Sequence, residues 1–479
     1  MMKFGMTLQQ RLTRPNWLAR FVAVGVVLGA TMQSARAHVS EQGLILLLPT
    51  GVYITSGVAA VALTVLLVVF LPDRQALLVF SKKVLFTVRP SNLHSWTSLV
   101  AFVFLASLVY LGFNGTRDPL TNPLPLFIWT VWWVGFVFAQ GVFGDLWRWL
   151  NPWAGFYDLL NRSVGMEPLF VMPEKFDVWP ALVPLFAFVV FTLADLSPDD
   201  PSRLAAFVTG YWLYTFIGML MFGGEIWLSR GECFTVLLRL YARLAPFSIK
   251  DGKLCVGTPG WRLVETSKVS VGGGVFVLMV LASGSFDGLN ETFWWLAKIG
   301  INPLEFPGRS AVVIPTIAGL AVANLALPLI FAATVYAGMV LAGQRENLAH
   351  TFSRLSLAVL PIALAYHFSH YLTVIMVNGQ YALAAASDPF ASGADYLGLG
   401  VFYVTTGFLN TSDTVKVIWL SQAGAVVIGH IIAVMMSHAI ALKIFGNARK
   451  AALSQLPTAV FMVAYTLFGL WLLASPRGL

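Results

Sequence analysis

The chain has 479 residues, of which 58% are hydrophobic and only 11% are charged, and its mean hydropathy is +0.77. A soluble domain is less apolar and about 25% charged, so this composition excludes a soluble globular protein. It predicts an all-α fold, a polytopic bundle of transmembrane helices in a lipid bilayer. The formal net charge is +8 at pH 7.

The first 37 residues have the organisation of a secretory signal peptide. Basic residues precede an apolar run at 21–32, and the small residues Ala35 and Ala37 frame a cleavage site. Cleavage would make His38 the first residue of the mature chain, where its α-amine and imidazole could chelate a metal together. An uncleaved first helix is the alternative, and either fate puts residue 38 outside.

Ten apolar segments follow, and each can cross a hydrocarbon core of about 30 Å as a helix that satisfies its own backbone. The fourth and sixth are the shortest. Residues 38–479 are therefore expected to form a single transmembrane domain. The expected spans lie near residues 44–71, 96–113, 124–143, 180–195, 204–228, 270–286, 310–342, 352–378, 415–441 and 457–475.

The basic residues predict the orientation of the bundle. With residue 38 outside, 19 of the 25 Lys and Arg residues after the leader fall in inner segments. This bias follows the positive-inside rule and predicts that both termini lie outside, in a bacterial inner membrane. Because these cations flank spans and would meet anionic headgroups, they do not indicate a nucleic-acid partner. A second membrane subunit or a homo-oligomer stays open.

Two connecting segments stand out. The Trp-rich inner segment 144–153 is expected to anchor the chain at headgroup depth. The apolar stretch 396–409 is too short to span, so we expect a re-entrant or surface helix there.

Histidines in the eighth and ninth spans are the main candidates for chemistry. His367 and His370 share one face of the eighth span, and His430 lies at a similar depth on the ninth. Ionisable groups are costly in a bilayer and tend to mark functional interiors. The alternative is that each histidine hydrogen-bonds a neighbouring helix and has only a structural role.

Three imidazoles from two helices would suit a divalent transition metal such as Zn or Cu. His38 is a further candidate ligand at the outer surface. Asp287, at the outer end of the sixth span, and Asp413 are the candidate carboxylates, as ligand or general base. Haem ligation fits less well, because neither span carries two histidines at the required spacing of about 13 or 14 residues.

Several motifs, in the same order along the chain, resemble those of a family of bacterial polytopic membrane proteins named fenitrothion hydrolases. The similarity covers roughly residues 38–475. The segments that carry it are 144–153, 230–232, 241–246, 285–288, 361–371, 429–430 and 451–457.

The family name implies hydrolysis of organophosphorus triesters, with release of a nitrophenol. An apolar triester would enter from the bilayer, and a metal could supply the hydroxide and polarise the phosphoryl group. In that scheme His367, His370 and His430 would be ligands, with Asp287 or Asp413 as base. The alternative is a transition-metal transporter or metal-assembly protein that uses the same histidines.

Overall fold

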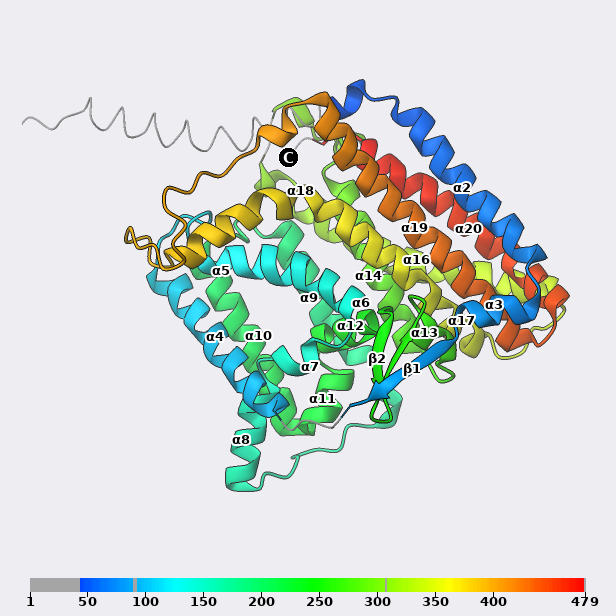
Figure 1. Ribbon diagram of the computed structural model, residues 1–479, viewed down its shortest axis with the longest axis horizontal. Coiled ribbons are helices and arrows are strands. Elements are labelled where there is room, and N and C mark those ends of the chain that lie inside the picture. The colour runs from blue at the N-terminus through cyan, green and yellow to red at the C-terminus, as the bar shows by residue number, and fades with distance from the viewer. Residues whose placement is uncertain (1–43, 89–92, 306–307, 478–479) are drawn as a thin grey trace, which may run out of the picture.

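The computed structural model describes residues 44–88, 93–305 and 308–477, which form an almost entirely helical bundle (Figure 1). Ten helical segments in this part of the chain are long and apolar enough to cross a membrane, so the prediction of an all-α, multi-pass membrane protein is confirmed. The expected leader 1–37 and His38 lie outside the described residues.

Seven of the ten spans are single helices, and the other three are composite. The third combines α5 (Pro123–Pro125), the π-helix η1 (Leu126–Phe136) and α6 (Val137–Phe143), and the fourth combines η2 (Glu174–Phe176) with α9 (Trp179–Ala194). The eighth joins α17 (Leu348–Ser356), η5 (Leu357–Val359) and α18 (Leu360–Ser387). The single helices are α2 (Thr50–Phe70), α4 (His94–Asn114), α10 (Pro201–Phe222), α14 (Val271–Asn290), α16 (Val313–Leu341), α19 (Ser412–Phe445) and α20 (Ala448–Ala474).

Both ends of the described chain lie at the same end of the bundle. Ile45, before α2, shares a buried cluster with Leu470 and Leu473 near the end of α20. An even number of spans returns the chain to the side where it began, so ten spans agree with the expected topology, in which both termini lie on one side. We call this the loop end, because the segment 388–411 between α18 and α19 also lies there, and we call the opposite end the sheet end.

A three-stranded antiparallel sheet at the sheet end interrupts the helical pattern, and the sequence patterns did not indicate it. Its order is β1 (Lys82–Thr87), β3 (Lys253–Gly257), β2 (Phe247–Lys250). Asp251 and Gly252 join β2 to β3 with φ of 51° and 70°, the positive values that a two-residue hairpin turn requires. The short helices outside the spans include α3 (Asp73–Val79), α7 (Trp147–Leu150), α8 (Ala154–Val164), α11 (Gly224–Arg230), α12 (Cys233–Ala242), α13 (Trp261–Glu265) and α15 (Phe293–Lys298).

Only part of the Trp-rich segment 144–153 lies at the surface, where Asp145, Arg148 and Leu150 are exposed. Trp147 and Trp153 are each only 4% exposed and belong to the main hydrophobic core. The indole N–H of Trp147 donates to Thr235 Oγ1 on α12 at 2.9 Å. The prediction of a headgroup anchor is therefore wrong for these two rings, because both are buried within the protein.

The segment 396–409 is not a helix that re-enters or lies on the bundle, so that prediction is also wrong. It contains only a 3-10 turn at Gly407–Leu409. Asp395 accepts hydrogen bonds from the backbone N–H groups of Leu399 and Gly400 at 2.7 and 2.9 Å. Such local bonds offer the backbone an alternative to a helix.

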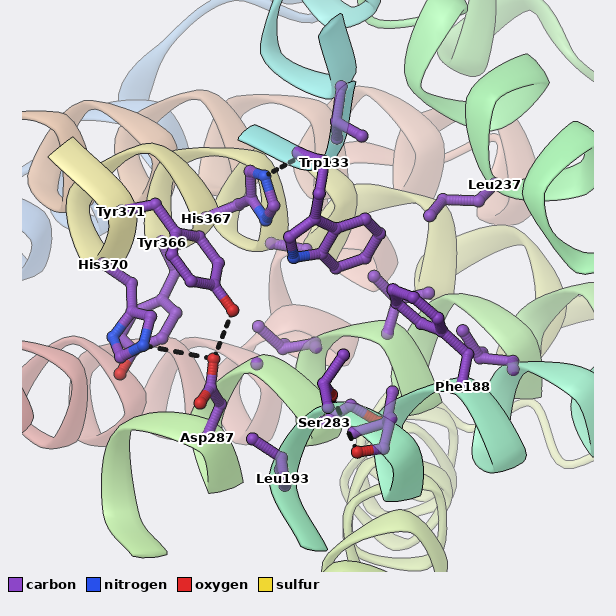
Figure 2. A pocket seen from close by; sticks show the side chains of 18 of the residues that line it. Trp133, Phe188, Leu193, Leu237, Ser283, Asp287, Tyr366, His367, His370 and Tyr371 are labelled. Atoms are coloured by element: carbon purple, nitrogen blue, oxygen red, sulfur yellow. Dashed lines mark hydrogen bonds and ion pairs between the residues drawn. The ribbon is translucent and has the colours of Figure 1, made fainter. Parts of the chain in front are cut away.

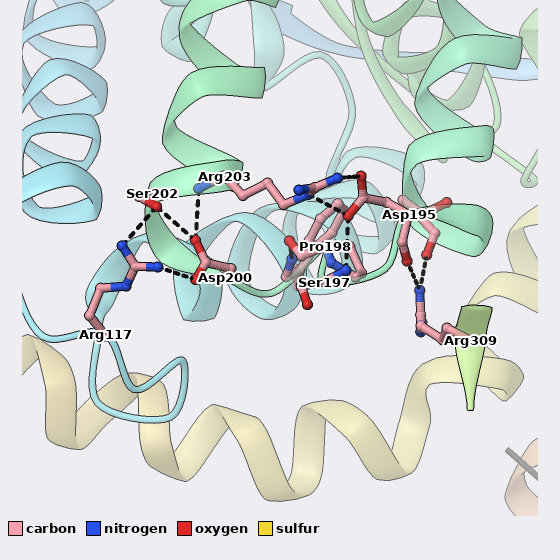
Figure 3. A network of polar contacts seen from close by, with 10 residues as sticks. Arg117, Asp195, Ser197, Pro198, Asp200, Ser202, Arg203 and Arg309 are labelled. Atoms are coloured by element: carbon pink, nitrogen blue, oxygen red, sulfur yellow. Dashed lines mark hydrogen bonds and ion pairs between the residues drawn. The ribbon is translucent and has the colours of Figure 1, made fainter. Parts of the chain in front are cut away.

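A network of ion pairs connects helices at the loop end (Figure 3). Arg203 on α10 binds both carboxylate oxygens of Asp195, which follows α9, at 2.7 Å. Arg309, before α16, donates to the Asp195 carbonyl oxygen at 3.0 Å. Asp200 caps α10 through the backbone N–H of Arg203 and binds Arg117 at 2.8 Å. These contacts fix the relative positions of α9, α10 and the segment before α16.

Candidate functional site

A small cavity inside the bundle brings together polar residues of two central spans. Its volume is about 60 Å³, which is room for about four water molecules. Helices α14 and α18 supply its polar wall, and α9, α12 and η1 supply its apolar wall. Figure 2 shows this arrangement, with Asp287 and His370 on one side and Trp133 and Phe188 on the other.

A close pair of side chains, Asp287 and His370, lies at the centre of the polar wall. His370 Nε2 lies 3.1 Å from Asp287 Oδ2, and the two side chains are only 7% and 15% exposed. Asp287 is in the last turns of α14, so it lies toward the loop end. A buried carboxylate is costly unless it is paired, and this contact provides the partner.

Tyr371 supplies a second donor to the same carboxylate. Its hydroxyl donates to Asp287 Oδ2 at 2.5 Å. Its ring also makes edge contacts with the imidazoles of His367 and His370, at centroid distances of 5.0 and 4.7 Å. Two donors and close ring packing hold the Asp287–His370 pair in one geometry.

The other nitrogen of His370 is buried and has no partner. Among the described residues, neither Nδ1 of His370 nor the hydroxyl of Tyr366 forms a hydrogen bond. The Tyr366 ring stacks on the His370 imidazole with a centroid distance of 5.8 Å and an interplanar angle of 15°. With Nε2 held by Asp287, Nδ1 is the nitrogen left to accept a proton from a bound molecule.

His367 faces a different partner. Its Nε2–H donates to the carbonyl oxygen of Trp133 at 2.8 Å, and the two rings meet edge to face at 5.1 Å. Trp133 belongs to the π-helix, whose wider turns are rare and occur frequently at functional sites. His367 therefore links α18 to this irregular span.

The other predicted site residues are not part of the cavity. His430 donates from Nδ1 to the Val426 carbonyl oxygen of its own helix at 2.8 Å, and its ring lies 6.5 Å from that of Tyr465 on α20. Asp413 is exposed in the first turn of α19. The placement of His38 is outside the described residues.

The donor set does not match the expected metal centre. In the described ranges there is no group of three or more His, Cys, Asp or Glu side chains arranged to hold one metal ion. His367 is directed at Trp133, and His430 is directed at its own helix. Of the predicted ligands, only His370 is paired with a carboxylate, Asp287.

A second carboxylate lies just beyond α14. Burial raises the pKa of Glu291, Arg477 opposes this, and the negative charge of Asp287 adds to it. The end of α14 thus places two acidic groups, one arginine and His370 within electrostatic reach of one another.

The sequence patterns identified some of these residues and missed others. Asp287, His367 and His370 were predicted and do line one cavity. Tyr366 and Tyr371 were missed, although their position beside the two histidines in the segment 361–371 was an available signal. No sequence signal pointed to Trp133, because its backbone carbonyl oxygen, and not a characteristic side chain, accepts the hydrogen bond from His367.

Compared with known proteins, the chain matches no family model, no curated protein and no solved structure.

Proposed function

We propose that this chain is a membrane-embedded hydrolase of apolar phosphotriesters, in a bacterial inner membrane with its sheet end toward the cytoplasm. The observation that carries the proposal is the buried His370–Asp287 pair. Within the part of the chain that the structure describes, Nδ1 of His370 has no hydrogen-bond partner, and the pair lines a cavity that has room for water molecules. A histidine oriented by a carboxylate is a common general base. The resemblance described above suggests the substrate class.

In the proposed reaction, His370 activates a water molecule. Nδ1 accepts a proton as the water oxygen attacks phosphorus, so the phosphorus–oxygen bond forms while the bond to the aryl oxygen breaks. A nitrophenolate leaves with the bonding electron pair and needs little protonation. Asp287 stabilises the imidazolium that results, and the unpartnered Tyr366 hydroxyl is the available donor to the developing phosphoryl charge.

This mechanism replaces the metal-activated water expected from the sequence. A catalytic metal usually has three protein ligands, and the described residues do not assemble three around this cavity. We therefore derive no step through a metal. Because a triester is larger than about 60 Å³, the proposal also requires the wall formed by Trp133 and Phe188 to open.

Nitrophenol release by the purified full-length chain tests the proposal. His370→Gln removes the base, and we expect a loss of roughly 10²- to 10⁴-fold in kcat. The matched control is His430→Gln, which changes a buried histidine that does not line the cavity and should leave turnover within a few-fold of wild type. Equal losses in both variants, or full activity of His370→Gln, would contradict the assignment.

The alternative is a transition-metal transporter, and the acidic groups Asp287 and Glu291 beside His370 favour it over other transport classes. Metal content and metal uptake by cells separate the two functions. Uptake that depends on His370, without any triester turnover, would support transport and overturn the hydrolase. Turnover by a metal-free preparation would support the hydrolase.

A further inference from the structure

A second, much larger cavity lies between α4, α10 and the π-helix η1. Its volume is about 670 Å³, within the range of small-molecule binding sites. Of its 23 lining residues, 13 are aromatic, whereas aromatic residues make up only 14% of the whole chain. Within this lining, the ring of Trp132 contacts the rings of Trp147 and Phe234.

The rim of this cavity lies on the outer surface of the helix bundle. Trp96 and Val100 on α4 line it and are 62% and 69% exposed, and Val131 on η1 is 42% exposed. These residues lie in helices that cross the membrane, so an apolar molecule could enter sideways from the bilayer.

Most polar groups of the lining are already engaged. The Tyr211 hydroxyl donates to Glu232, and the indole N–H groups of Trp147 and Trp212 donate to Thr235 Oγ1 and to the Pro152 carbonyl oxygen. The Thr97 hydroxyl donates to the His94 carbonyl oxygen. A polar ligand would lose its hydration in this cavity and gain few hydrogen-bond partners. The cavity therefore disfavours polar ligands.

We propose that this cavity binds a flat, apolar aromatic molecule that enters from the bilayer. Many aromatic walls favour an aromatic guest, because rings gain from edge-to-face and offset contacts beyond the burial of area. Phe188 lines this cavity and also the cavity of Asp287 and His370, so its ring separates the two. Binding here does not depend on hydrolysis and would occur in a catalytically inactive chain.

The test uses the full-length chain in lipid nanodiscs and 4-nitrotoluene, whose nitroaromatic ring quenches tryptophan emission. We expect a saturable quenching component, in addition to the linear component from probe dissolved in the lipid. Naphthalene should displace the saturable component by competition. Asp287→Asn should keep it, which separates this inference from the proposed hydrolase.

Cavity-filling variants locate the site. Ala101→Phe puts a ring into the cavity from α4 and should weaken the saturable component at least tenfold. Val103→Phe is the matched control, because Val103 is on the same helix, 57% exposed, and does not line the cavity. If Ala101→Phe does not fold, Val208→Phe with the control Ala206→Phe repeats the comparison on α10.

Three outcomes would overturn the proposal. Quenching that is linear in probe concentration would mean partition into lipid only. Unchanged saturable binding in both filling variants would place the probe elsewhere. Phospholipid that copurifies in wild type, is lost in the filling variants and resists naphthalene would show that the cavity holds an acyl chain instead.

Discussion

The hydroxyl of Tyr366 lies directly against the α-carbon of Gly288. A Cβ atom built on Gly288 would be 1.9 Å from the Tyr366 hydroxyl oxygen, far inside any real contact. Glycine at this position of α14 thus lets the tyrosine of α18 approach and stack on His370. The residue next to Asp287 therefore has a packing role in the site.

Gly288→Ala should destabilise the protein by about 1 to 3 kcal/mol, because the added methyl group must displace Tyr366. Thermal unfolding in detergent measures the change. Removing the hydroxyl with Tyr366→Phe should recover most of the loss in the double variant. Gly284→Ala is the control, since its Cβ would lie 3.7 Å from Tyr366 Cδ1, an ordinary contact. Equal effects of the two alanines would refute this packing.

Tyr371→Phe should lower both stability and turnover. It removes one of the two donors to Asp287 Oδ2, and a hydrogen bond to a charged group contributes about 1.5 to 3 kcal/mol. Because His370 keeps its own contact with Asp287, we expect a smaller loss of kcat than in His370→Gln. Tyr336→Phe, at a residue 46% exposed on α16, is the control for loss of a tyrosine hydroxyl. A Tyr371→Phe enzyme with unchanged kcat would remove Tyr371 from the site.

The spans were predictable because bilayer thickness fixes the length of an apolar helix. The pairing of Asp287 with His370 was only partly predictable. The sequence places both residues toward the outer half of their spans, but the rotation of each helix about its axis decides which side chains meet. That rotation depends on packing, such as the contact of Gly429 with Ala365, where a Cβ would come within 2.6 Å.

The orientation of His430 was not predictable from the sequence for the same reason. The sequence puts His430 at a depth similar to that of His367, but Nδ1 of His430 is hydrogen-bonded to the Val426 carbonyl oxygen of its own helix. The π-helix and the sheet were also missed. An apolar run such as 124–143 is compatible with an α-helix and with a π-helix, so it does not distinguish the two. Strand β1 pairs with β3, about 170 residues away in the chain, and no local pattern encodes such a pairing.

Thr235→Val should cost about 1 to 3 kcal/mol, although threonine and valine have the same shape. The change leaves the buried indole N–H of Trp147 without an acceptor, and an unsatisfied buried donor carries this penalty. Thr235→Ser keeps the hydroxyl and is the matched control. Thermal unfolding followed by tryptophan fluorescence measures the stability of both variants. A fully stable Thr235→Val chain would mean that Trp147 does not depend on this bond.

Acidification should loosen the loop-end network in a way that depends on Arg203. Partial burial raises the pKa of Asp195, but its hydrogen bonds with Arg203 and Ser197 outweigh this, so the pKa lies below its ordinary value of 3.8. For Asp200 the backbone N–H of Arg203 is the largest cause of a lowered pKa.

A carboxylate with a lowered pKa in the folded state stabilises the fold at pH values above 3.8, and the contribution is lost as the pH falls through the lowered pKa. Arg203→Gln returns the pKa of Asp195 toward 3.8 and leaves the backbone cap of Asp200 in place. Wild type should therefore lose more Tm than Arg203→Gln between pH 6 and about pH 3. Lys416→Gln, which removes a cation at the start of α19, controls for net charge. Parallel Tm curves for wild type and Arg203→Gln would show that the Asp195–Arg203 pair contributes nothing to stability at neutral pH.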